Sequence, residues 1–206
     1  MILDPAAGTW NDAYRLITSV VVPRPIAFVS TLSPAGVPNL APFSFFTVVC
    51  ANPLTICFAP MRRGPTAEKK DTLKNLEASG EFVVNVVDER WADAMNLTSA
   101  DFSPEVSEFE AARLTPAPCE LVRAPRVLES PVSLECVTQQ VIEVGEGPGS
   151  GSLVLGTVVR AHVRDELYAG GLVKPGEGWQ PIARCGGATY LRLTDTFELA
   201  RPAKAP

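Results

Sequence analysis

The sequence predicts a mainly β, barrel-like fold with a few short helices. Short runs rich in β-branched and aromatic residues recur along the chain, clusters of Gly, Pro, Ser and Asn separate them, and few segments carry a helical pattern. This pattern favours a barrel over a doubly wound sheet. No linker-like stretch divides the chain, so we expect a single domain over residues 1–206, with its core at about 14–193.

The first third of the chain predicts a helix and a hairpin. Residues 9–20 have a helical pattern with Tyr14 among their apolar positions. Residues 26–31 form a β-rich run, residues 33–36 read Ser-Pro-Ala-Gly, and a second strand begins at 37–39. A turn between two β-rich runs predicts an antiparallel pair.

The middle of the chain predicts a helix between two strands. Residues 54–59 and 81–87 are β-rich, and residues 72–79 form a helix that ends at Gly80. A second helix is expected over residues 88–95, because Asp88 is a good N-cap. The Ser-, Pro- and Glu-rich stretch that follows, through Glu110, is expected to be a surface excursion.

The last third predicts a long hairpin and a final strand. Residues 132–144 and 153–163 are of similar length and character, and the glycine-rich run 145–151 between them is expected to be the hairpin tip. A last strand is expected over 188–193.

Composition excludes several function classes. The chain has 18 basic and 23 acidic residues, so a nucleic-acid backbone or an anionic membrane has no bulk electrostatic reason to bind it. No signal-like or membrane-spanning segment is evident, and five scattered cysteines without a Cys-x-x-Cys suit reduced thiols, so we expect a cytoplasmic protein.

The familiar catalytic patterns are missing from the sequence. It contains no G-x-G-x-x-G, P-loop or H-E-x-x-H motif. The single histidine, His162, cannot supply a multi-histidine metal site, and no nucleophile elbow accompanies it. The sequence therefore gives little support for a hydrolase or a metalloenzyme.

A group of basic residues before the helix at 72–79 suits a phosphate. Arg62, Arg63 and Lys70 flank a helix start that Asp71 or Thr72 can cap. A solvated basic loop before an ordinary capped helix explains these residues equally well.

Two segments upstream of this helix also have both a ligand-binding and a structural interpretation. Ala41-Pro42-Phe43-Ser44-Phe45-Phe46 can line a flat ring or form a core strand, and the hydroxyls of Ser30 and Thr31 can bind a ligand or close their strand onto the following turn.

In combination these motifs resemble a known family. The chain is similar to the flavin reductase-like family of FMN-binding split barrels from about Tyr14 to about Leu193, with the motifs in family order. The similar segments are Arg24-Pro25-Ile26-Ala27-Phe28-Val29-Ser30-Thr31, Asn39-Leu40-Ala41-Pro42-Phe43-Ser44-Phe45-Phe46, Lys70-Asp71-Thr72-Leu73-Lys74-Asn75, Phe82-Val83-Val84-Asn85 and Arg184-Cys185-Gly186-Gly187 with Tyr190.

The resemblance implies a homodimeric split β-barrel that binds FMN non-covalently, with the ring near the subunit interface. By position, the residues expected at the isoalloxazine and ribityl chain are Ser30, Thr31, Asn39, Ala41 and Ser44. Those expected at the phosphate end are Arg63, Lys70, Asp71 and Thr72. Because a carboxylate repels a phosphate, Asp71 is expected to cap the helix or to pair with Lys70 or Arg63.

Two further residues carry open alternatives. Strand alternation puts His162 on one face with Val158 and Arg160, where it is expected to face the flavin or nicotinamide, as a catalytic residue, or solvent. Cys185 stands where the family commonly has Leu, and it is expected to be an inert filler near the site.

The function that follows is an oxidoreductase of the NAD(P)H:flavin type. NADH or NADPH would reduce the flavin, which would pass electrons to a partner oxygenase, a ferric complex or another acceptor. The alternatives are a flavoredoxin-like electron-transfer protein without direct nicotinamide oxidation, a barrel that binds no flavin, and a flavin-dependent enzyme acting on an organic substrate.

Overall fold

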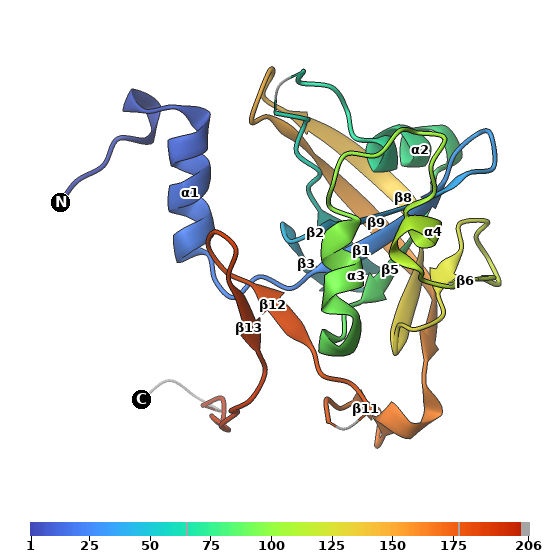
Figure 1. Cartoon of the computed structure of the whole chain (residues 1–206). Coiled ribbons are helices and arrows are strands. Elements are labelled where there is room, and N and C mark those ends of the chain that lie inside the picture. Colours follow the sequence, from blue (N-terminus) through green and yellow to red (C-terminus); the bar gives the residue numbers. More distant parts are fainter. Residues whose placement is uncertain (65, 177, 203–206) are drawn as a thin grey trace.

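The computed structural model describes residues 1–64, 66–176 and 178–202. Its centre is a seven-stranded sheet in the order β2-β1-β5-β8-β9-β4-β3, in which every neighbouring pair is antiparallel (Figure 1). The strands are β1 (Ala27–Leu32), β2 (Pro38–Phe43), β3 (Phe46–Ala51), β4 (Leu54–Phe58), β5 (Glu81–Val86), β8 (Val132–Val144) and β9 (Gly151–Val163).

The sheet curls into a partly closed barrel. Strands β2 and β4 are far apart in the sheet order, yet the rings of Phe43 and Phe58 lie 5.3 Å apart, and Phe58 also packs on Phe82 at 5.4 Å. Contact between non-neighbouring strands requires the sheet to fold around a shared interior. The predicted β, barrel-like fold is confirmed.

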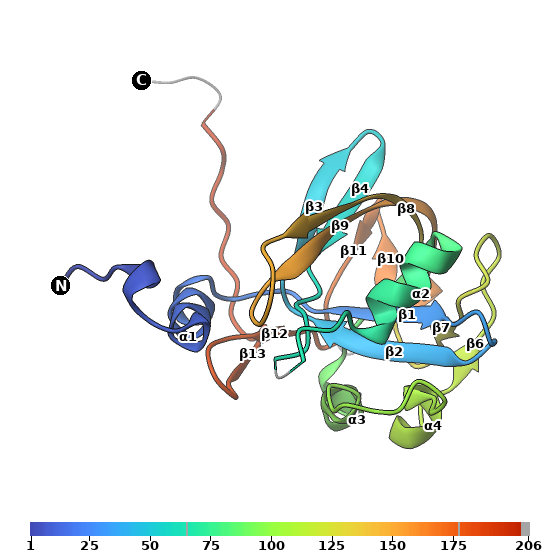
Figure 2. The ribbon, with the colours of Figure 1, turned by 90° about the horizontal axis from the view of Figure 1, so that it is seen from above.

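Helices cover both faces of the β1–β2 hairpin (Figure 2). On one side, Leu73 and Leu76 of α2 (Asp71–Ser79) join the barrel interior. On the other side, α3 (Ala92–Leu97) and α4 (Glu108–Ala112) place Met95 and Phe109 in a second cluster around Phe28. Because side chains alternate along a strand, neighbouring residues of β1 point to these two different cores.

Helix α1 (Trp10–Val20) stands away from the sheet beside the C-terminal hairpin of β12 (Ile182–Arg184) and β13 (Tyr190–Arg192), as Figure 1 shows. It begins with a reciprocal capping box, in which Thr9 and Asp12 each bond the other's backbone N–H. None of the helices among the described residues has the length and apolar character needed to cross a membrane.

Most predicted elements are present. The expected helix at 88–95 is divided into a 3-10 turn at Glu89–Trp91, capped by Asp88, and α3. The expected surface excursion contains α4, whose Phe109 is buried. The strands β3 and β12 were not predicted: β3 is a β-rich run that pairs with the next strand, β4, and β12 has only three residues.

A bulge corrects the predicted alternation in β9. Glu135 pairs with Arg160, whereas the next residue of β8, Cys136, pairs with Val158, so Val159 has no partner. The extra residue turns Val158 into the barrel interior beside Cys136 and leaves Arg160 on the opposite face with His162. The grouping of Arg160 with His162 is confirmed, and that of Val158 with them is wrong.

Candidate functional site

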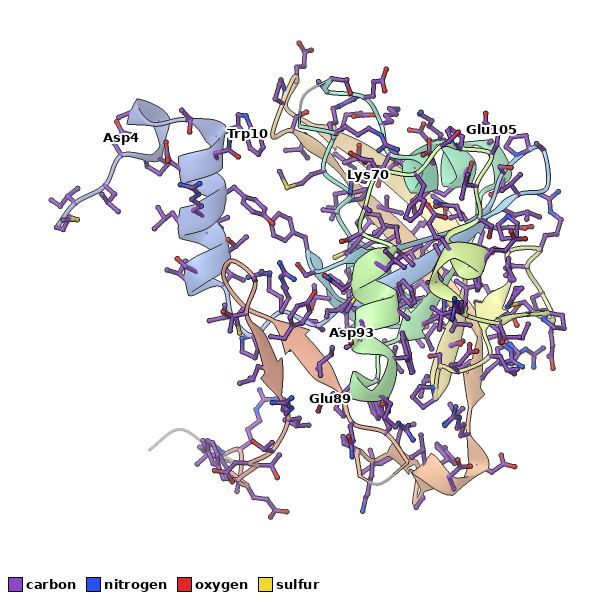
Figure 3. The ribbon with its side chains drawn as sticks, in the orientation of Figure 1. Asp4, Trp10, Lys70, Glu89, Asp93 and Glu105 are labelled. Atoms are coloured by element: carbon purple, nitrogen blue, oxygen red, sulfur yellow. The ribbon has the colours of Figure 1, made fainter. Side chains whose placement is uncertain are left out.

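The N-terminus of α2 carries an unpaired cation. Lys70 is the N-cap residue and gives no side-chain cap, so the amide N–H groups of Asp71 and Thr72 have no intrahelical acceptor. Among the described residues, no hydrogen bond or ion pair engages the Lys70 ammonium, which lies 5.9 Å from the centroid of the Phe43 ring (Figure 3 labels Lys70). Burial lowers the pKa of Lys70. A half-buried ammonium beside free helix amides favours an anionic ligand.

Arg63 stands next to this helix start and is held by two carboxylates. Its guanidinium donates to Asp71 Oδ2 at 2.7 Å and also pairs with Asp101. The Asp101 side chain is 73% exposed, whereas that of Asp71 is 14% exposed. The expected Arg63–Asp71 pair is confirmed, and the expected cap by Asp71 or Thr72 is wrong, since the helix begins at Asp71 and lacks a side-chain cap. We call Arg63, Lys70 and the Asp71 and Thr72 amides the anion site.

A polar network anchors the anion site to the β1–β2 hairpin. The Asn39 Oδ1 accepts hydrogen bonds from Thr72 Oγ1 at 2.8 Å and from Thr31 Oγ1 at 3.2 Å. Asn75 donates to Thr31, and Glu108 of α4 accepts from the Asn39 amide at 2.7 Å. These bonds bring together Thr31, Asn39 and Thr72, three of the residues expected in the site. They also connect α2 to the β1–β2 hairpin.

Ser30 lies on the other face of the sheet. Its hydroxyl donates to the Pro125 carbonyl at 2.5 Å and accepts from Asn85, and the residue is completely buried. Since adjacent strand residues point in opposite directions, the hydroxyls of Ser30 and Thr31 do not share one site. The expectation that both side chains face one ligand is corrected accordingly.

Ser44 opens onto a small cavity of about 200 Å³. Its hydroxyl accepts a hydrogen bond from Arg24 Nε at 3.3 Å, and Arg24 is fixed by the carbonyls of Thr18, Val21 and Cys185. Ala41 lies on the same face of β2 as Phe43. It packs on the interior core and does not line the cavity. The lining of this Ser44 cavity comprises Tyr14, Ile26, Pro42, Ser44, Met95, Asn96, Ser99, Arg184 and Tyr190.

The Ser44 cavity and the anion site lie on the two sides of the edge strand β2, near its C-terminal end. Pro42 lines the cavity, and the next residue, Phe43, supplies the ring beside the Lys70 ammonium. Ser99 lines the cavity, and Asp101 reaches Arg63 two residues later. The end of β2 therefore carries an anion site on one side and an aromatic, hydroxyl-bearing cavity on the other.

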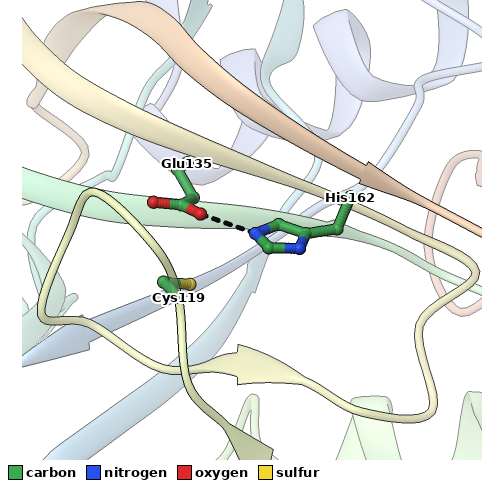
Figure 4. Close-up of side chains that lie close together, drawn as sticks. All are labelled: Cys119, Glu135 and His162. Atoms are coloured by element: carbon green, nitrogen blue, oxygen red, sulfur yellow. Dashed lines mark hydrogen bonds and ion pairs between the residues drawn. The ribbon is translucent and has the colours of Figure 1, made fainter.

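His162 belongs to a different cluster, shown in Figure 4. Its Nε2 lies 2.5 Å from Oε1 of Glu135, whose side chain is fully buried. Glu135 pairs with Val83, on the face of the sheet away from α2, and strand neighbours that lie opposite each other share a face. Within this chain, the side chain of His162 therefore points away from the anion site and toward Glu135.

Cys119 completes that cluster on the loop that crosses Glu135. The Glu135 carboxylate accepts backbone N–H bonds from Glu120, Leu121 and Val122. Burial alone would raise the pKa of Glu135, but these bonds and His162 together lower it. Burial, with a smaller contribution from Glu135, raises the pKa of Cys119 to about 11. We call Cys119, Glu135 and His162 the thiol cluster.

Several residues of the site escaped the sequence analysis. Arg24, Asn96, Asp101 and Glu108 come from separate elements, and only the folded chain brings them to the β1–β2 hairpin. Burial raises the pKa of Glu108, a sign that its carboxylate sits in a structural position. Cys185, half-buried in the C-terminal hairpin, contributes its carbonyl to Arg24.

Comparison with known proteins identifies the family to which this fold belongs. The model of the flavin reductase-like domain matches residues 19–177. The structure superimposes on nitrilotriacetate monooxygenase component B from Bacillus cereus with a TM-score of 0.91 and 40% identity, covering 97% of this chain and 98% of that one.

Two further structures are similar over nearly their whole lengths. The 2-nitrobenzoate 2-nitroreductase of Pseudomonas fluorescens gives a TM-score of 0.86 and 34% identity, covering 100% of this chain and 98% of that one. A putative flavin reductase with a split barrel domain from Shewanella frigidimarina gives 0.83 and 22% identity, covering 98% and 100%, and this likeness shows the split-barrel fold. The chain belongs to the flavin reductase-like domain family.

Proposed function

We propose that this protein binds FMN and acts as an NAD(P)H:flavin oxidoreductase. The observation that carries the proposal is the half-buried Lys70 ammonium at an uncapped helix start, which has no hydrogen-bond or ion-pair partner among the residues that the structure describes. A buried charge without a partner is costly, so its retention favours a ligand of opposite charge at that position. The FMN phosphate has that charge, and riboflavin lacks it.

The chain's own residues would position the flavin. The amides of Asp71 and Thr72 and the Lys70 ammonium would hold the phosphate, and the Thr31–Asn39–Thr72 network keeps them in place. Pro42 and Ser44 would flank the ring in the Ser44 cavity. When bound, FMN supplies the hydride and electron transfer chemistry, so the protein needs no acid–base pair of its own.

A second subunit would complete the ring site. The Ser44 cavity of about 200 Å³ is smaller than the 300–1,000 Å³ of ordinary ligand pockets. Apolar residues at Ile17 of α1 and at Val48 and Val49 of β3 are exposed. We propose that a homodimer buries these surfaces and closes the ring site, in a cytoplasmic protein whose five thiols are free.

Anaerobic flavin bleaching tests the activity. Purified protein, FMN and NADH or NADPH are mixed without oxygen and the blue absorbance of the flavin is followed. The proposal expects bleaching with at least one nicotinamide at a rate well above that of free FMN. A yellow protein that is inert toward both nicotinamides would indicate an electron-transfer protein, and a colourless one without FMN affinity would overturn the proposal.

Direct reduction of an organic substrate is the second candidate. It is favoured by the 34% identity and full-length superposition with a protein described as a 2-nitrobenzoate 2-nitroreductase. Arg184 supplies a positive charge in the wall of the Ser44 cavity, which suits an aromatic carboxylate. Adding 2-nitrobenzoate to the reduced protein separates the candidates: reoxidation without oxygen supports the second, and persistence of the bleached flavin excludes it.

A further inference from the structure

We propose that Cys119, Glu135 and His162 form a binding site for a zinc-class divalent cation. The three ligand atoms, a thiol sulfur, a carboxylate oxygen and an imidazole nitrogen, all lie within 4.8 Å of one another (Figure 4). They come from the loop after Ala117, from β8 and from β9, so a cation here would tie three separate segments together.

The spacing is close to that of a filled site. Tetrahedral zinc with bonds of about 2.0 to 2.3 Å places its ligand atoms about 3.3 to 3.7 Å apart. The Glu135–His162 pair at 2.5 Å would open by about an ångström, and the thiol, at most 4.8 Å away, would approach by a similar amount. We expect His162 to make most of this movement, because its side chain is 24% exposed and that of Glu135 is fully buried.

The ligand set selects the metal class. Thiolate and imidazole ligands suit zinc and related transition metals, whereas magnesium and calcium prefer oxygen ligands throughout. Three protein ligands leave a fourth position for water or another ligand.

The surroundings already supply the outer contacts of such a site. Glu120 N–H donates to Oε1 of Glu135, and the Leu121 and Val122 amides donate to Oε2. These bonds hold the carboxylate in place, so its oxygen Oε1, which now contacts His162, would be the metal ligand and His162 the group that moves. A divalent cation would displace the proton of the Cys119 thiol to solvent and would neutralise the resulting thiolate together with the Glu135 carboxylate.

Cobalt(II) is the probe that tests the site. The flavin-loaded protein is freed of metal by a chelator and dialysis and then titrated with Co²⁺. We expect one Co²⁺ per chain, a thiolate-to-cobalt band in the near-ultraviolet difference spectrum, intense bands in the red where flavin does not absorb, and their loss when Zn²⁺ is added. A spectrum without the thiolate band would overturn the proposal.

Matched variants assign the ligands. Cys119→Ser should abolish the thiolate band and His162→Gln should weaken Co²⁺ binding at least tenfold, whereas Cys185→Ser and Cys50→Ser should change neither. Should a cluster variant fail to fold, alkylation of the wild type decides. Zn²⁺ should slow the modification of Cys119 at least tenfold and leave that of exposed Cys50 unchanged. Equal protection of both thiols, or of neither, contradicts the site.

Discussion

The two faces of the central sheet carry opposite electrostatic arrangements. Beside α2, the Lys70 ammonium has no partner among the described residues and the helix amides are free. On the other face, the Glu135 carboxylate accepts bonds from three amides and from His162. One face is thus prepared to receive an anion, and the other holds its own anion among amide donors, a histidine and a thiol.

This difference separates a site that still needs an anion from one that already contains its own. A buried polar group that is fully bonded stabilises the fold, whereas one that lacks a partner costs free energy until a ligand arrives. Substitution on the Glu135 face should therefore lower stability, and substitution on the Lys70 face should lower ligand affinity with little effect on stability.

Removing the Glu135 carboxylate should give the largest effect. Glu135→Ala leaves three backbone N–H groups without an acceptor, so the free energy of unfolding should fall by about 3 to 5 kcal/mol. Urea unfolding measures it. The exposed Glu146→Ala is the matched control and should stay within about 0.5 kcal/mol. A loss below about 1 kcal/mol in Glu135→Ala would mean that the network does not hold the loop.

Removing the Lys70 ammonium should weaken FMN without weakening riboflavin. One charge-assisted bond is worth about 1.5 to 3 kcal/mol, which corresponds to about ten- to a hundredfold in the dissociation constant for FMN. Quenching of flavin fluorescence measures both ligands. The neighbouring Lys69→Ala is the control, because that ammonium already pairs with Glu77 and Glu143. Equal losses for FMN and riboflavin would remove Lys70 from the phosphate.

The pH dependence of FMN binding should follow Lys70. Burial lowers its pKa below the ordinary 10.5. The bound phosphate favours the ammonium, so FMN affinity should be constant near neutral pH and should fall as pH rises through this lowered pKa. Riboflavin carries the same ring and corrects for the ring's own titration. In Lys70→Arg the fall should move to higher pH, and an unchanged profile would point to another group.

Removing the Asp101 carboxylate should give the smallest effect, in the opposite direction. Its exposed carboxylate competes with a phosphate for Arg63. Exposed ion pairs are worth about 0.2 to 1 kcal/mol, so Asp101→Asn should tighten FMN binding by about 1.5- to fivefold. Isothermal calorimetry at low salt can resolve this change in FMN affinity, and added salt should reduce the difference between the variant and the wild type. Weaker binding in this variant would show that Asp101 supports the ligand.

Local patterns predicted the fold well. The hairpin of β1 and β2, the end of α2 at Gly80 and the long β8–β9 hairpin all follow from short-range signals, namely turn residues and β-rich runs. The pairing of Asp71 with Arg63 was one of the three alternatives expected for that carboxylate. Elements that depend on distant partners, such as β12 and α4, were missed because their sequences carry weak signals of their own.

The candidate site was predicted less completely. Strand alternation was sufficient to separate Ser30 from Thr31, but the similarity of the motif grouped them. The bulge at Val159 and the position of Glu135 beside His162 depend on the register of β8 against β9, which a single sequence does not specify. The thiol cluster could therefore be found only in the folded chain.

A crystal structure of the protein grown with excess FMN tests the central claim most directly. The account predicts the phosphate within hydrogen-bond distance of Lys70 Nζ and of the Asp71 and Thr72 amides, with the ring against Pro42 and Ser44. Flavin bound elsewhere, with Lys70 still unpaired, would contradict it.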